Sequence, residues 1–153
     1  MSRRDSISIL VADDDPDDRM LIEDAFKENC IGNHLDFVED GEQLLAYLRR
    51  EGDWAHLEGQ PYPGLVLLDL NMPKMDGREA LRQMKEDERF RTIPVVVVTT
   101  SKAEEDILRT YVTGVNSFIT KPVTFEGLVE VVRILSNYWI EIVQLPPGCV
   151  RHA

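Results

Sequence analysis

Hydrophobic residues are distributed along the chain in two patterns, short apolar runs and longer stripes with helical spacing. An aliphatic run bounded by turn residues is typical of a strand covered on both faces of a parallel sheet. Apolar residues that recur every three to four positions are typical of an amphipathic helix. The patterns predict strands at 7–12, 34–39, 65–69, 94–101 and 115–120, and helices at 16–29, 41–50, 77 onward, 103–111 and 125–145.

The alternation of strand and helix sets the fold class. Five β/α units in succession predict an α/β fold, a doubly wound five-stranded parallel sheet with helices on both faces and right-handed crossovers. We expect a single domain at 7–145 with an extended last helix, an N-terminal tail at 1–6 and a C-terminal tail at 146–153. Residues 51–64, which include Trp54 and two prolines, are predicted to form a long loop before the central strand.

The first predicted helix has a clear N-terminal signal. Asp15 is placed to cap it, and Pro16, whose fixed φ suits the first helical position, follows at once. The helix carries an apolar stripe that we expect to face the core. The stripe consists of Met20, Leu21, Ala25 and Phe26.

The last predicted helix, which Thr124 is placed to cap, has an apolar surface wider than one buried face requires. Its inward stripe is expected to consist of Leu128, Val131, Val132, Leu135, Trp139 and Ile142. Beside that stripe lie Val129, Ile134, Tyr138 and Val143. A hydrophobic cover over the sheet or a frayed end would explain the excess. We favour self-association, because an isologous dimer buries the helix in both copies.

Composition and charge argue against some classes of binding partner. The formal net charge is −11 and the sequence pI is near 4.7, with no cluster of Lys and Arg to bind phosphates. We therefore expect neither nucleic acid nor a membrane as a partner. No apolar run has the length of a transmembrane helix or of a signal-peptide core. The two cysteines are far apart and lack metal-ligand spacing, so we expect a cytoplasmic protein.

Polar side chains with useful chemistry stand at the ends of four predicted strands. Asp13 and Asp14 follow the first strand, Asp69 ends the central one, Thr99 lies near the end of the fourth and Lys121 follows the fifth. Taken alone, an acid or a hydroxyl at the end of a strand can cap the next helix, and a lysine there is usually a surface residue. Parallel strands present their carboxyl ends at one edge of the sheet, where open α/β sheets bind ligands. We therefore expect these five side chains to form one site, with grouped carboxylates that repel one another unless they share a cation.

These residues make the chain similar to the receiver domain of two-component response regulators. The resemblance covers about residues 7–135 and rests on motifs at the strand ends. They are Asp13-Asp14, Asp69-x-x-x-Pro73-x-x-Asp76-Gly77, Thr99, Phe118 and Lys121-Pro122. Within that family the chain most resembles the small stand-alone regulators that serve bacterial phytochrome kinases, through segments 71–79, 98–101 and 137–141. The resemblance implies a flavodoxin-like receiver fold with strand order 2-1-3-4-5.

The resemblance also implies a chemistry for the site. Asp69 would accept a phosphoryl group from a phosphohistidine of a histidine kinase and form an aspartyl phosphate. Mg²⁺ would be held by Asp14, by Asp69, by the backbone carbonyl of Asn71 and, through water, by Asp13. We expect the chain to catalyse only its own phosphorylation and dephosphorylation.

Two further residues are implied to bind phosphoryl oxygens, Lys121 through its ammonium group and Thr99 through its hydroxyl. If Thr99 moves toward the phosphoryl group, Phe118 can turn inward and alter the face formed by the fourth helix, fifth strand and fifth helix. The output would pass to a downstream protein or to a phosphotransfer domain. A homodimer through the last helix is expected to use Tyr138, Trp139 and Ile142.

Two other functions stay open on the sequence. A phosphatase of the haloacid dehalogenase class also forms an aspartyl phosphate at a strand end, but its Asp-x-Asp motif needs an acid where this chain has Asn71. A receiver-like scaffold would bind partners without being phosphorylated. Failure to bind Mg²⁺ would favour the scaffold.

Overall fold

The computed structural model describes residues 8–29, 34–69, 72, 74–75, 77–99, 117–120 and 124–138, and the structural statements below concern these residues. Their side chains are described except at 99, 117–120 and 136–138. The predicted helix at 103–111 and both predicted tails lie outside this part of the chain. Every helix within it is too short or too polar to cross a bilayer.

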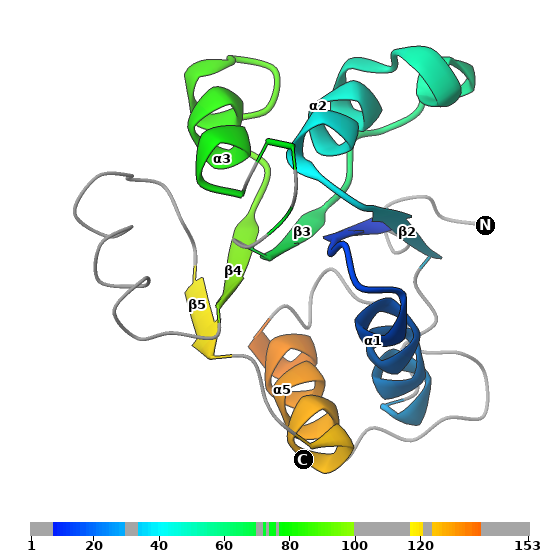
Figure 1. The fold of residues 1–153 in the computed structure, drawn as a ribbon, viewed down its shortest axis with the longest axis vertical. Coiled ribbons are helices and arrows are strands. Elements are labelled where there is room, and N and C mark those ends of the chain that lie inside the picture. The colour runs from blue at the N-terminus through cyan, green and yellow to red at the C-terminus, as the bar shows by residue number, and fades with distance from the viewer. Residues whose placement is uncertain are drawn as a thin grey trace.

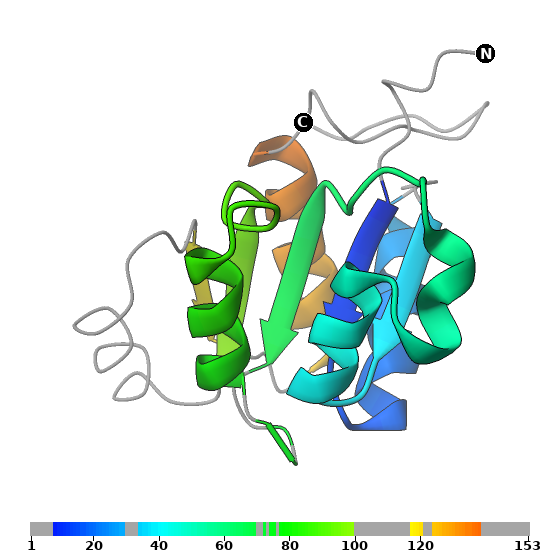
Figure 2. The same ribbon diagram turned by 90° about the horizontal axis from the view of Figure 1, so that it is seen from above.

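The strands form one parallel sheet in the order β2-β1-β3-β4-β5. They are β1 (Ser8–Ala12), β2 (His34–Val38), β3 (Leu65–Asp69), β4 (Val95–Thr99) and β5 (Ser117–Thr120). Figure 2 shows β1 and β3 running side by side toward the same edge of the sheet. The predicted α/β fold and its strand order are therefore confirmed.

Helices cover both faces of the sheet. They are α1 (Pro16–Glu28), α2 (Gly41–Arg49), α3 (Gly77–Glu86) and α5 (Phe125–Tyr138). In Figure 1, α1 and α5 pack together on one face, and α2 and α3 cover the other. Each face has its own apolar core, with Phe26 and Val132 in the first and Leu44 and Leu81 in the second. Because both faces are covered, all five residues of β3 are buried, as its unbroken aliphatic run predicted.

Side chains cap α1 and α5 where the sequence predicted them to. The Asp15 carboxylate accepts a hydrogen bond of 2.9 Å from the Asp17 N–H at the start of α1, and Pro16 occupies the first turn. The Thr124 hydroxyl oxygen accepts one of 3.0 Å from the Gly127 N–H at the start of α5. These bonds satisfy N–H groups that have no partner within the helix.

The predicted apolar stripe of the first helix is partly wrong. Ala25 and Phe26 are buried as expected, but Met20 and Leu21 are 56% and 38% exposed, and Ile22 is buried instead. Each residue turns the helix by about 100°. A stripe that contains Ile22, Ala25 and Phe26 therefore leaves Met20 on the opposite side of the helix and Leu21 at the border of the buried face.

The orientation of α5 agrees with its predicted stripe and extends it. Four residues of that stripe contact the core shared with α1: Leu128, Val131, Val132 and Leu135. Val129, predicted to lie beside the stripe, also packs against this core, and the Asn29 amide donates a 2.9 Å hydrogen bond to its carbonyl oxygen. Ile134 is 54% exposed, so part of the apolar excess does face outward. The Tyr138 side chain and the whole of Trp139 and Ile142 lie outside the described residues.

The segment predicted as a long loop before β3 contains a 3-10 helix, η2 (Gly52–Leu57). Arg50, which ends α2 in a left-handed conformation, holds this segment against the domain. Its guanidinium group lies over the rings of Tyr47 and Tyr62, at 5.5 and 5.0 Å from their centroids. It also donates hydrogen bonds of 3.0 Å each to the Gln60 and Pro61 carbonyl oxygens. Such contacts leave no periodic pattern in the sequence, so hydrophobic periodicity could not predict them.

Candidate functional site

Three aspartates gather at the carboxyl edge of the sheet. Carboxylate oxygens of Asp13, Asp14 and Asp69 all lie within 4.8 Å of one another. The sheet register explains the cluster, because Ala12 pairs with Leu68 and the acids come next on each of two neighbouring parallel strands. Asp13 and Asp69 are only 3% and 6% exposed, whereas Asp14 is exposed. The structure thus brings together three of the five side chains that were predicted to form one site.

Asp13 is fixed through its backbone and its carboxylate. Its N–H donates a 3.0 Å hydrogen bond to the Val38 carbonyl oxygen at the end of β2. Its carboxylate accepts one of 3.0 Å from the Asp15 N–H, at the turn into α1. Its carbonyl oxygen accepts one of 2.7 Å from Arg19, whose guanidinium also lies 3.4 Å from the Glu39 carboxylate. The β1–α1 turn thus orients the Asp13 carboxylate, and the end of β2 holds the Asp13 backbone.

Asp69 takes its position from the central strand. β3 pairs with β1 on one side and with β4 on the other, and Asp69 lies opposite Val98 of β4. A strand with a neighbour on each side and helices over both faces has little freedom to shift. Asp69 therefore stands at the end of a strand that is enclosed on all sides.

The donor set fits a small, hard divalent cation. Carboxylate oxygens are the ligands that Mg²⁺ prefers, and three of them converge here from two adjacent strand ends. Like charges held this close repel, and a shared cation removes that repulsion. Because Asp14 is exposed, the cluster opens to solvent on its side, which leaves room for water or a reactant.

Of the other predicted site residues, the structure describes only the backbone of Thr99 and Phe118. Thr99 ends β4 and pairs with Thr120, the last residue of β5. Phe118 pairs with Val97 along the same two strands. Asn71 and Lys121 lie outside the described residues altogether. The backbone thus supports the predicted place of Thr99, and the roles of all four side chains stay predictions.

Sequence reasoning missed the contacts that hold the β1–α1 turn and part of the loop after Asp69. Arg19 and Glu39 connect the β1–α1 turn to the end of β2. Gly41 donates its N–H to the Met75 carbonyl oxygen at 2.8 Å, in the loop that follows Asp69. These contacts join loops that are distant in sequence, so no local pattern could have shown them.

Comparisons with known proteins cover most of the chain. A family model for the response regulator receiver domain matches residues 9–133, which include Asp13, Asp14 and Asp69. Response regulator Rcp1 of Synechocystis sp. is 38% identical over 138 residues, 90% of this chain and 92% of Rcp1. FilR2 of Methanothrix harundinacea, a probable methanogenesis regulatory protein, is 40% identical over 141 residues, 92% of this chain and 88% of FilR2.

Solved structures are similar over nearly the same length. The phosphorylated cyanobacterial phytochrome response regulator RcpA has a TM-score of 0.78 at 38% identity, covering 92% of this chain and 99% of RcpA. The Mn²⁺-bound form of Rcp1 has a TM-score of 0.76 at 37% identity, with the same coverage of 92% and 99%. The similarity therefore holds in sequence and in three dimensions.

Proposed function

The chain belongs to the family of response regulator receiver domains, and we propose that Asp69 is the residue at which it accepts a phosphoryl group from a histidine kinase. Phosphorylation-dependent signalling is the function that fits a receiver domain with relatives such as Rcp1. RcpA, which is similar over 92% of this chain, was crystallised in a phosphorylated form.

The observation that carries the proposal is the position of Asp69. It is buried at the carboxyl end of the central strand, with oxygens of Asp13 and Asp14 within 4.8 Å of its own. In the proposed step an Asp69 carboxylate oxygen forms a bond to phosphorus while the bond from phosphorus to the donor nitrogen breaks. A carboxylate and a phosphoryl group are both anionic, so the site must supply positive charge.

The acidic cluster is suited to hold Mg²⁺, as receiver domains do. When bound, Mg²⁺ would neutralise charge on the phosphoryl oxygens. We assign Asp14, Asp69 and the backbone carbonyl of Asn71 as direct ligands and Asp13 as a ligand through water. The burial of Asp13 and the exposure of Asp14 are compatible with this division.

Lys121 and Thr99 complete the proposed site. Thr99 ends β4, and Lys121 comes directly after Thr120, which ends β5 beside it. Lys121 would contribute a second positive charge, and the Thr99 hydroxyl would donate a hydrogen bond to a phosphoryl oxygen. A movement of Thr99, followed by an inward turn of Phe118, would carry the change to the surface of α5 and its neighbours.

The family implies a histidine kinase as the phosphoryl donor. RcpA is described as a cyanobacterial phytochrome response regulator, and on that likeness we propose a bacterial phytochrome kinase as the partner. Downstream, the regulator would act on another protein or pass the group to a phosphotransfer domain. With Asn71 where a dehalogenase-type phosphatase has its second acid, we propose self-phosphorylation and self-dephosphorylation as its only catalysis.

We also propose that residues 7–145 form one domain that pairs with a second copy through the last helix. The contact would use Tyr138, Trp139 and Ile142. The exposed Ile134 supports an apolar outer surface on α5. Two copies related by a twofold axis would bury this surface on both sides.

Incubation with acetyl phosphate and Mg²⁺ tests the proposed function. Transfer to Asp69 releases acetate, and intact-mass spectrometry should show one phosphoryl adduct. Asp69→Asn should abolish the adduct, whereas Asp87→Asn, in the turn that follows α3, should leave it unchanged. An adduct retained in Asp69→Asn would contradict the assignment of the acceptor. The absence of any adduct in the wild type would favour a scaffold that is not phosphorylated.

A further inference from the structure

The turn between β2 and α2 contacts both Asp13 and the loop that follows Asp69. It contributes no proposed ligand to the metal site. We propose that this β2–α2 corner, residues 38–41, sets the position of the loop after Asp69 relative to Asp13, and that Gly41 is its principal positioning residue. The inference rests on the proposed function, because it concerns how the metal and phosphoryl site is held in shape.

The first half of the corner holds the Asp13 side of the site. The Val38 carbonyl oxygen accepts the Asp13 N–H at 3.0 Å. The next residue, Glu39, lies 3.4 Å from the Arg19 guanidinium, which also donates to the Asp13 carbonyl oxygen at 2.7 Å. The Arg19 side chain is only 19% exposed, so it is enclosed between these groups. The corner is therefore bonded to Asp13 directly and through Arg19.

The second half of the corner holds the loop after Asp69. The Gly41 N–H donates to the Met75 carbonyl oxygen at 2.8 Å. Asp40, whose side chain is 4% exposed, caps α2 and lies 3.9 Å from the Lys74 ammonium group. Lys74 has a φ of +61°, in the left-handed region that costs a side-chain-bearing residue free energy. The contacts from Asp40 and Gly41 flank this unfavourable conformation and are suited to stabilise it.

Only glycine permits this approach at position 41. A Cβ there would lie 2.9 Å from both the carbonyl carbon and the Cβ of Met75, and closer still to the carbonyl oxygen. Real Cβ atoms essentially never come within 3.0 Å of such a neighbour. Two of the three close neighbours are backbone atoms, so no side-chain rotation can relieve the overlap. Any side chain at position 41 therefore requires the backbone at Met75 or at the start of α2 to shift.

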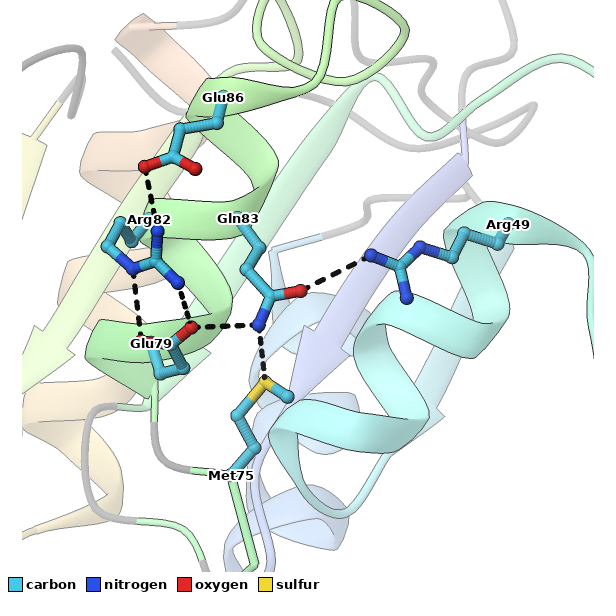
Figure 3. Close-up of polar contacts among 6 residues, drawn as sticks. All are labelled: Arg49, Met75, Glu79, Arg82, Gln83 and Glu86. Atoms are coloured by element: carbon cyan, nitrogen blue, oxygen red, sulfur yellow. Dashed lines mark hydrogen bonds and ion pairs between the residues drawn. The ribbon is translucent and has the colours of Figure 1, made fainter.

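The side chain of Met75 is held as well as its backbone. Figure 3 shows the Gln83 amide of α3 pointing at the Met75 sulfur, at 3.9 Å, and accepting a 3.2 Å hydrogen bond from Arg49 of α2. The same amide donates to the Glu79 carboxylate at 2.8 Å. Met72 of the same loop is buried in the core below α2 and α3. Met72 and Met75 are thus held against α2 and α3, and the Gly41 N–H joins the Met75 backbone to the start of α2.

A displaced loop should weaken metal binding before it affects the fold. The loop contains Asn71, whose carbonyl is a proposed ligand, and groups that orient ligands commonly change metal affinity by about 10–100-fold when altered. Gly41 contributes no side chain to either apolar cluster, but Met72 and Met75 of the loop pack in the cluster below α2 and α3, so stability has to be measured separately from affinity. A purely structural role for Gly41 would lower stability and leave the affinity of the folded protein unchanged.

The test measures Mn²⁺ binding to the full chain by electron paramagnetic resonance at a temperature well below unfolding. Gly41→Ala should bind Mn²⁺ at least about tenfold more weakly than the wild type, and its phosphorylation by acetyl phosphate should need correspondingly more metal. Glu42→Ala, an exposed change one residue further along α2, is the matched control and should bind like the wild type. Circular dichroism and thermal unfolding report the fold separately.

A second variant keeps the test decisive if Gly41→Ala does not fold. Arg19→Met removes a positive charge near the acids, which by Coulomb attraction alone should strengthen cation binding. The proposed role predicts weaker binding instead, because Asp13 loses its connection to Glu39. Wild-type affinity in folded Gly41→Ala, or unchanged or tighter binding in Arg19→Met, would overturn the inference. Failure of the wild type to bind Mn²⁺ would instead overturn the proposed function.

Discussion

Oxygens of the buried carboxylates of Asp13 and Asp69 lie within 4.8 Å of each other at the ends of two neighbouring strands. Their closeness follows from the register of β1 and β3 and does not depend on a flexible loop. Burial strengthens the repulsion between two negative charges. A divalent cation that enters from the side of Asp14 would therefore stabilise the folded state as well as prepare the site.

We predict that Mg²⁺ raises the thermal stability of the wild-type protein. A ligand that binds only the folded state stabilises it by about 2.7 kcal/mol at one hundred times its Kd. Asp14→Asn should lose most of this increment, because it removes the exposed carboxylate of the cluster. Thermal unfolding with and without Mg²⁺ measures the effect, and an equal Mg²⁺-induced rise in Asp14→Asn would contradict it.

The sequence was sufficient to predict the parallel sheet and the acidic cluster. Aliphatic runs mark buried parallel strands, and the rule that their carboxyl ends share an edge brings Asp13, Asp14 and Asp69 together without further information. The contact between Gly41 and Met75 could not be predicted in this way, because it depends on how closely two separate loops approach. The contacts of the buried Arg50 could not be predicted for the same reason, because its partners are backbone carbonyls and ring faces.

Helix orientation was predicted less well than helix position. In α1 both Leu21 and Ile22 are aliphatic, so the pattern alone could not decide which of them faces the core. The structure buries Ile22, Ala25 and Phe26 against α5 and the sheet. Tertiary packing with α5 selected the rotation of the helix, and a single helix sequence does not contain that information.

This difference in α1 gives a direct test by mutation. Ile22→Ala should destabilise the protein by about 2–5 kcal/mol, because it leaves a cavity in a packed core. Leu21→Ala, at the border of the buried face and 38% exposed, should cost clearly less than Ile22→Ala. Urea unfolding of the two variants measures both free energies. The reverse order would mean that the helix is turned as the sequence pattern first suggested.

A third prediction concerns Tyr47 and alkaline pH. Its hydroxyl donates a 2.6 Å hydrogen bond to the Asp36 carboxylate. Burial of the phenol, reinforced by that hydrogen bond and by the Asp36 charge, raises the pKa of Tyr47 far above its usual value near 10. Above pH 10 the unfolded state releases this proton while the folded state keeps it. The contribution of Tyr47 to stability is therefore complete below that pH and declines as the pH rises further.

Tyr47→Phe is the variant that isolates this effect. It should lower the free energy of unfolding at pH 7 by about 1 kcal/mol, the usual value of one lost hydrogen bond. Its stability should then fall less steeply than that of the wild type between pH 10 and pH 11. Denaturant unfolding at both pH values gives the slopes, and absorbance at 295 nm follows the phenol. Parallel stability curves would show that the Tyr47 pKa is not raised.

The last prediction concerns the outer surface of α5. Ile134 is 54% exposed on a helix whose other side is already occupied by the core, so a second copy of the chain is the proposed cover. Ile134→Glu would place a charge inside such an interface and should shift the protein toward monomer by at least about tenfold in dissociation constant, equivalent to about 1.4 kcal/mol. Met20→Glu alters a similarly exposed apolar residue, 56% exposed on α1, and should leave the assembly unchanged.

Sedimentation velocity over a range of concentrations, with and without beryllofluoride as an acyl-phosphate mimic, separates the possible outcomes. A dimer that weakens in Ile134→Glu but not in Met20→Glu would assign the interface to α5. Equal weakening in both variants would indicate a general effect of added negative charge on a chain that already carries −11. A wild-type mass that stays monomeric at every concentration, with the mimic bound or not, would remove the dimer and leave α5 to contact a different protein.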